Sequence, residues 1–132
     1  MIRPVLRVAS VAAVIAAIAA SSVPASAQTV EETYVRYHAA IFAADECTDY
    51  DLIQLGTDDA DAEWKSQAQN NMGAYIDAQV GGAIGAGDRL TLIEAAKSET
   101  DAYIAENGCD GPMAQELLGI FNRELEPLLP PR

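Results

Sequence analysis

The chain has 132 residues, and its 20 Asp and Glu against 8 Lys and Arg give a formal net charge of −12 at pH 7. A negative balance of this size repels the phosphates of nucleic acids and anionic lipid surfaces, so neither is expected as a partner. It suits a basic protein partner or divalent cations, but the acidic surface of a soluble secreted protein is the simpler explanation.

The first 27 residues have the three parts of a secretory signal peptide. Arg3 and Arg7 give a positive start, residues 8–20 are apolar, and residues 25–27 form an A-x-A cleavage site. The apolar run is short for a bilayer and no stop-transfer segment follows, so we expect cleavage between Ala27 and Gln28 and no stable membrane anchor afterwards. The mature protein is then periplasmic or secreted. It keeps six Lys and Arg against 20 Asp and Glu, a net charge near −14.

The mature chain has helical patterns and no convincing strand pattern, so the predicted fold class is all-α, a small bundle of four to five helices held by one disulfide. Residues 28–125 are the predicted helical domain. A first helix begins at a capping box of Thr29 and Glu32 and ends near Asp45. Its apolar face is expected to contain Val30, Tyr34, Tyr37 and Ile41. A short helix over residues 50–55 follows, capped by Thr48 or Asp49.

The next helix is predicted to begin at Thr57 or Asp58, where an acidic first turn complements the helix dipole. Its apolar face consists of Trp64, Ala68, Met72, Tyr75, Ile76 and Val80. Residues 81–87 (GGAIGAG) interrupt this pattern, because each glycine lowers helix propensity by roughly 1 kcal/mol relative to alanine. We therefore predict a hinge or loop at Gly81, Gly82, Gly85 and Gly87.

A further helix is predicted over residues 88–106 and ends at Asn107 and Gly108, which tolerate a left-handed conformation. Its expected apolar face is Leu90, Ile93, Ala96, Thr100, Tyr103 and Ile104. The last helix is capped by Asp110 or Gly111 and has Pro112 in its first turn. Its expected buried residues are Met113, Leu117, Ile120 and Phe121. Pro130 and Pro131 prevent the helix from continuing, so residues 126–132 are predicted to form an extended, mobile tail.

Cys47 and Cys109 are the two cysteines of the chain. Export would place them in an oxidising compartment, where an even number of cysteines in a small domain usually forms disulfides. Their pairing closes a loop of about 62 residues, for which loop entropy gives about 4 kcal/mol of stability. A redox site is the alternative, but neither cysteine lies in a C-x-x-C motif.

Motifs that would indicate catalysis are missing from the sequence. His38 is the single histidine and falls beside Tyr34 and Ile41, which favours a structural role. Residues 58–64 resemble the start of a calcium loop, but Trp64 replaces its glycine and Asn70 its last glutamate. The glycines of residues 81–87 do not follow a strand, so they are no dinucleotide-binding motif. The sequence therefore predicts no enzyme, and no catalytic, cofactor-binding or metal-binding residue.

Two short segments resemble the periplasmic acid-stress chaperones of the HdeA type. In residues 47–55, Cys47 is followed by Asp49 and Tyr50, and in residues 107–112, Cys109 precedes the last helix. The resemblance implies a small, exported, all-helical protein with one disulfide that loosens in acid and exposes apolar surface to client proteins. Two effects of acid oppose each other here. Crowded carboxylates favour the folded state when they are protonated, whereas repulsion among the six cations and His38 opposes it.

The predicted function is therefore the binding of a protein partner or client, with a periplasmic stress chaperone as its leading form. The alternative is a small acidic inhibitor or immunity-type protein that masks a basic partner, because complementary charge favours fast and selective association. No cofactor is expected in either case, and no sequence feature specifies an oligomeric state.

Overall fold

The computed structural model describes residues 29–53 and 60–132. In these residues the regular structure consists of four α-helices, α2 (Val30–Cys47), α3 (Ala62–Gln79), α4 (Ala86–Asn107) and α5 (Pro112–Ile120), with no strand. A 3-10 turn, η2 (Gly81–Ala83), lies between α3 and α4. After α5 the chain continues as a π-helical turn, η3 (Phe121–Leu125), and a 3-10 turn, η4 (Glu126–Leu128). The predicted all-α class is confirmed, and none of the described helices is long and apolar enough to cross a membrane.

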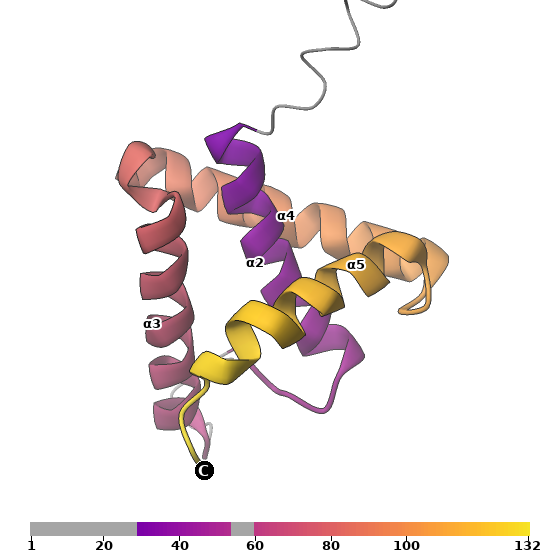
Figure 1. Cartoon of the computed structure of the whole chain (residues 1–132). Coiled ribbons are helices and arrows are strands. Elements are labelled where there is room, and N and C mark those ends of the chain that lie inside the picture. Colours follow the sequence, from indigo (N-terminus) through magenta and orange to yellow (C-terminus); the bar gives the residue numbers. More distant parts are fainter. Residues whose placement is uncertain (1–28, 54–59) are drawn as a thin grey trace, which may run out of the picture.

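Helix α2 is the centre of the fold and lies between α4 and α5 (Figure 1). All six residues from Ala39 to Ala44 are buried, and four of them are alanines. Such small side chains allow neighbouring helices to pack closely on more than one side. The predicted one-sided apolar face was therefore wrong in part, because Val30 is 43% exposed while residues 39–44 are buried around the helix.

The predicted helix ends are confirmed where short-range signals determine them. Thr29 Oγ1 accepts a hydrogen bond from the Glu32 backbone N–H at 3.0 Å, which begins α2. Gly108 ends α4 with φ of 76°, a left-handed conformation that favours glycine. Gly111 precedes Pro112, and a Cβ atom on Gly111 would lie only 2.6 Å from the Tyr103 hydroxyl oxygen. A glycine at position 111 therefore lets Tyr103 approach the start of α5.

The short helix predicted after Cys47 is not formed in residues 48–53. Side-chain oxygens accept hydrogen bonds from the backbone N–H groups of this segment and hold it in a non-helical turn. Asp45 Oδ1 accepts from the N–H groups of Leu52 at 2.7 Å and Ile53 at 3.2 Å, and Thr48 Oγ1 accepts from Tyr50 at 3.1 Å. Side chains of this kind compete with helix formation. Residues 54–59, which include the predicted caps Thr57 and Asp58, lie outside the described residues, and α3 begins at Ala62 after Asp61.

Two expected core residues lie on the surface instead. Leu90 is 62% exposed and Met113 is 37% exposed, whereas Leu92, outside the predicted face, packs against the core. Helix α4 starts at Ala86 after the N-cap Gly85, so Gly87 belongs to its first turn and not to a loop.

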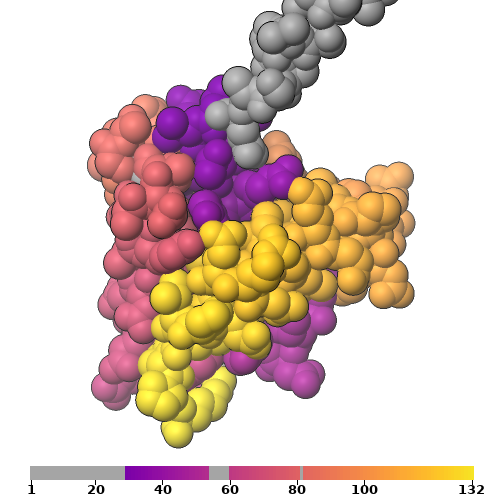
Figure 2. Space-filling view, viewed as in Figure 1, coloured from indigo at the N-terminus to yellow at the C-terminus, as the bar shows by residue number. Residues whose placement is uncertain are grey.

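The C-terminal tail packs along α3. Residues 126–128 form a 3-10 turn and are not extended as predicted, whereas residues 129–132 follow outside any helix. Trp64 Nε1 donates to the Pro130 carbonyl oxygen at 2.9 Å, and the Arg132 guanidinium lies 4.0 Å from the centre of the Trp64 ring. Figure 2 shows this tail in yellow against the lower part of α3.

Candidate functional site at the α3 interface

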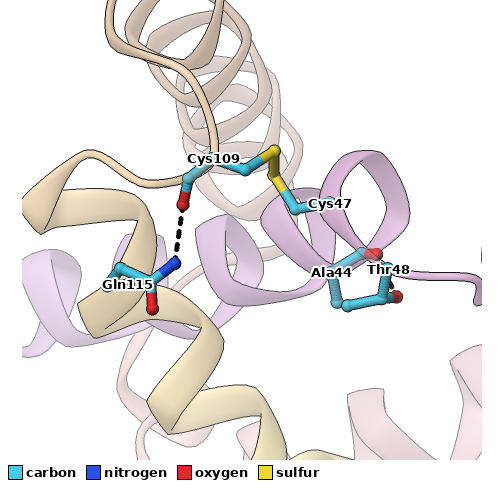
Figure 3. The surroundings of a disulfide bond; sticks show 5 residues. All are labelled: Ala44, Cys47, Thr48, Cys109 and Gln115. Atoms are coloured by element: carbon cyan, nitrogen blue, oxygen red, sulfur yellow. Dashed lines mark hydrogen bonds between the residues drawn. A yellow bond between two sulfur atoms is a disulfide. The ribbon is translucent and has the colours of Figure 1, made fainter.

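The predicted disulfide between Cys47 and Cys109 is present in the structure. It joins the last residue of α2 to the turn between α4 and α5, with a Cα to Cα distance of 5.7 Å (Figure 3). Gln115 Nε2 donates to the Cys109 carbonyl oxygen at 2.7 Å and holds this turn on α5. Helices α2, α4 and α5 thus form a cross-linked unit, which we call the disulfide-linked body. Helix α3 lies inside the closed loop and remains tethered at both ends.

Between α3 and the disulfide-linked body lies a cavity of about 400 Å³. Its apolar wall is formed by Ile41 and Phe42 of α2, Ile53, and Ile93 of α4. Gln69 and Asn70 of α3 and His38 of α2 supply the polar groups. Figure 1 shows α3 set to one side of α2. An apolar cavity of this kind weakens the attachment of α3, because its lining lacks packing partners.

His38 lines this cavity and is the most strongly perturbed basic group there. Its ring packs on Tyr34 with 4.6 Å between the ring centres. Burial lowers the pKa of His38 to about 4, and the negative charge of Asp77 on α3 only partly opposes this effect. Asp77 itself pairs with Arg89 of α4, with 3.1 Å between Oδ2 and Nη1. His38 is therefore neutral at pH 7, and its protonation works against the folded state.

Carboxylates make several of the contacts that hold α3. Lys65 Nζ lies 2.9 Å from Asp51 Oδ2, and the Lys65 side chain is only 1% exposed. Asp77 of α3 pairs with Arg89 as described above, and Asp61, the N-cap residue of α3, pairs with Arg132 at 3.4 Å. Hydrogen bonds to a charged carboxylate are stronger than those to its neutral form. The negative charges of these carboxylates therefore contribute to the attachment of α3.

Glu124 is a carboxylate that joins three elements of the fold. It lies in the π-helical turn η3, and its Oε1 accepts hydrogen bonds from the hydroxyls of Tyr37 and Tyr75, each at 2.8 Å. The two rings meet edge to face with 6.0 Å between their centres. Burial and the hydrogen bond to Glu124 raise the pKa of Tyr37, so its hydroxyl stays a donor. One carboxylate oxygen therefore connects α2, α3 and η3.

Replacing Glu124 by alanine is expected to lower the free energy of unfolding by about 2–3 kcal/mol at pH 7, because two partly buried phenols lose a charged acceptor. Urea unfolding followed by circular dichroism measures this loss. The matched control is Glu94→Ala, since Glu94 is exposed on α4. The control is expected to change stability by no more than about 0.5 kcal/mol. Equal losses in the two variants would contradict the role of Glu124.

A carboxyl pair between α2 and α4 responds to acid in the opposite direction. Burial and the neighbouring Asp101 carboxyl raise the pKa of Glu46. Asp101 Oδ2 accepts from Lys97 Nζ at 2.8 Å, while Asp101 Oδ1 is buried without a hydrogen-bond partner among the described residues. A proton on Glu46 supplies a donor to the Asp101 carboxylate. A proton on Glu46 therefore strengthens the contact between α2 and α4, whereas a proton on His38 weakens the attachment of α3.

The glycines predicted as a hinge lie at the turn from α3 to α4. Gly81 and Gly82 are in η2, and Gly85 caps α4. Arg89 braces this turn, because its Nε donates to the Ile84 carbonyl oxygen at 3.1 Å while its Nη1 contacts Asp77. The glycine segment thus forms the upper connection of α3, and hinge motion there stays a prediction.

No family model matches the chain, and no curated protein or solved structure matches it. In the part of the chain that the structure describes, no group of three or more His, Cys, Asp or Glu side chains is placed to hold a metal ion. The α3 interface, with its carboxylate contacts, His38 and the apolar cavity, is the candidate site on which a function can be argued.

Proposed function

We propose that this protein is an acid-responsive, chaperone-like protein that binds apolar segments of other proteins. In this proposal, low pH releases α3 from the disulfide-linked body, and the apolar surfaces that separate then bind the client. The observation that carries the proposal is that three carboxylates, those of Asp51, Asp77 and Glu124, form ion pairs or hydrogen bonds across the α3 interface. Ion pairs and charge-assisted hydrogen bonds of this kind weaken when the negative charge of the carboxylate is removed.

The direction of the acid response follows from where the titrating groups lie. Protonation of His38 in the apolar cavity opposes the packing of α3, because burial disfavours the charged form. The Glu46 and Asp101 pair, by contrast, lies within the disulfide-linked body and gains from a proton. Partial opening at α3, with the remaining helices still joined, is therefore the response that these groups favour.

Release of α3 would expose apolar side chains that suit varied clients. On α3 these include Met72 and Ile76, both completely buried in the closed structure, and on α2 they include Ile41 and Phe42. Methionine adapts its shape to different surfaces, and a contiguous apolar patch is typical of a protein-binding site. The resemblance to HdeA-type chaperones in residues 47–55 and 107–112 supports the same function. The disulfide is consistent with export, which the signal-peptide prediction also favours.

The first test is a titration of the oxidised mature protein from pH 7 to pH 2. Trp64 is the single tryptophan, belongs to α3 and packs against the core and the C-terminal tail, so its fluorescence reports the release of α3 from these contacts. We expect a red shift of this fluorescence and increased binding of a hydrophobic dye, while far-UV circular dichroism retains most of the helix signal. The opened protein should also suppress aggregation of citrate synthase brought to pH 3 and returned to neutral pH. A protein that stays closed and dye-silent to pH 2 would overturn the proposal.

A charge-neutral variant tests the same mechanism without acid. The triple variant Asp51→Asn, Asp77→Asn and Glu124→Gln replaces three carboxylates at the α3 interface by neutral amides. It is expected to bind the dye at pH 7. The matched control, Glu63→Gln, Glu94→Gln and Glu106→Gln, removes the same charge from exposed positions and should stay dye-silent. Equal behaviour of the two variants would assign the effect to net charge and not to the α3 interface.

A further inference from the structure

A second surface feature lies on the disulfide-linked body. It is a groove of about 590 Å³ between the first half of α2, the middle of α4 and the start of α5. Apart from Thr29, the described residues that line it belong to these three helices. In Figure 2 the surfaces of α2 in indigo and α5 in orange to yellow adjoin. Because the groove is built from helices that the disulfide joins, it is present in the closed protein at neutral pH.

The floor of the groove is apolar. It is formed by Val35 and Ala39 of α2, Leu92 of α4, and Met113 and Leu117 of α5. Met113 is 37% exposed, so part of this large apolar side chain is open to solvent in the groove. A cavity of this size on rigid helices has room for a few apolar side chains of a ligand, and methionine adapts its shape to them.

The rim of the groove is acidic. Its carboxylates are Glu31 and Glu32 of α2, Glu99 of α4 and Glu116 of α5. Arg36 is the basic residue in the described lining, and it forms an ion pair with Glu116. Four carboxylates against one guanidinium leave an excess of negative charge around an apolar floor. A ligand that matches both features carries positive charges on either side of an apolar strip.

We propose that this groove binds a cationic amphipathic helix of a partner protein, with Leu- or Ile-like anchors on the floor and Lys or Arg on the rim. Helices of this kind bind in apolar grooves through anchors spaced three and four residues apart. A second copy of this chain fits poorly, since 20 acidic residues against 8 basic ones make two copies repel. The proposal does not depend on the release of α3, because it concerns the closed protein at pH 7.

The probe is a fluorescent twelve-residue Leu and Lys peptide designed as an amphipathic helix, with a scrambled peptide of the same composition as its control. Binding to the oxidised mature protein is measured by fluorescence polarisation at pH 7. The affinity for the helical probe is expected to exceed that for the scrambled peptide and to fall as salt rises from about 20 to about 200 mM. Equal affinity for both peptides would overturn the proposal, because it would show attraction by net charge alone.

Two variants separate the rim from the floor. Glu31→Gln, Glu32→Gln and Glu99→Gln together are expected to weaken binding by about tenfold. The control with the same change in charge is Glu63→Gln, Glu94→Gln and Glu106→Gln, which lies outside the groove and should bind nearly as tightly as the unmodified protein. Equal weakening by the two triple variants would contradict a specific rim.

Met113→Glu tests the floor, because docking in the groove and a purely electrostatic attraction predict opposite changes in affinity. It adds a negative charge at an exposed position, so a purely electrostatic attraction would increase. Docking in the groove predicts weaker binding instead, because the apolar anchor loses its contact. Sedimentation of the unmodified protein completes the test, since a dimer that Met113→Glu dissociates would assign the groove to self-association and overturn the proposal. Failure of peptide binding at pH 7 leaves the acid titration of α3 as an independent result.

Discussion

Replacing Cys47 and Cys109 by serine is expected to lower the free energy of unfolding by about 4 kcal/mol, the loop-entropy value for a closed loop of about 62 residues. This loss is comparable to the whole stability of many small domains. The disulfide joins the end of the central helix α2 to the turn before α5. Without this bond the unfolded chain has more conformational freedom, which lowers the free energy of unfolding. Urea unfolding of the oxidised protein and the double variant measures the difference.

Reduction of the unmodified protein is the matched control, because it breaks the same bond without changing a residue. The reduced protein and the double variant should unfold at similar urea concentrations. Each single variant should match the double variant, since one cysteine alone closes no loop within the chain. An unchanged midpoint after reduction would show that the disulfide contributes no stability. Loss of the disulfide is also expected to shift the acid response, because α2, α4 and α5 are no longer cross-linked when α3 is released.

The parts of this fold that the sequence predicts are those encoded within a few residues. The Thr29 cap and the Gly108 stop each depend on one local interaction or conformation. The disulfide was predictable because two cysteines allow only one pairing within the chain. The central position of α2 was missed, although its signal was present. The run from Ala39 to Ala44 is apolar at every position, and a helix that is apolar all round is buried on all sides.

The α3 interface could not be predicted from local patterns. Glu124 is one of 20 acidic residues, and it meets Tyr37 and Tyr75 across sequence separations of 87 and 49 residues. Nothing near Glu124 in the chain distinguishes it from exposed acidic residues such as Glu94. Lys65 is similar, because the helical pattern places it beside an apolar face but does not reveal that it is almost completely buried. Such contacts can be identified only when the arrangement of the helices is known.

His38 is expected to make the folded protein less stable as the pH falls from about 6.5 to about 4. Its pKa is about 4 in the folded protein against a reference value of 6.5, so the unfolded state takes up the proton first. The contribution of neutral His38 is complete above pH 6.5, is lost between 6.5 and 4, and changes no further below pH 4. The full difference corresponds to at most about 3 kcal/mol.

The variant that isolates this effect is His38→Gln, which cannot be protonated in this range. Its stability at pH 7 also changes, because the contact with the Tyr34 ring is lost, so the slope with pH is compared and not the absolute value. Urea unfolding at pH 7, 6, 5 and 4 should give a loss between pH 7 and 4 that is smaller by up to about 3 kcal/mol than in the unmodified protein. The groups that act on His38, namely Tyr34 and Asp77, are the same in both proteins, so their contributions cancel. Glu46→Gln supplies the opposite control, since the raised pKa of Glu46 stabilises the folded state in acid and its removal should steepen the loss. If His38→Gln and the unmodified protein had equal slopes, protonation of His38 would not contribute to the acid sensitivity, and the cavity around His38 would have no part in releasing α3.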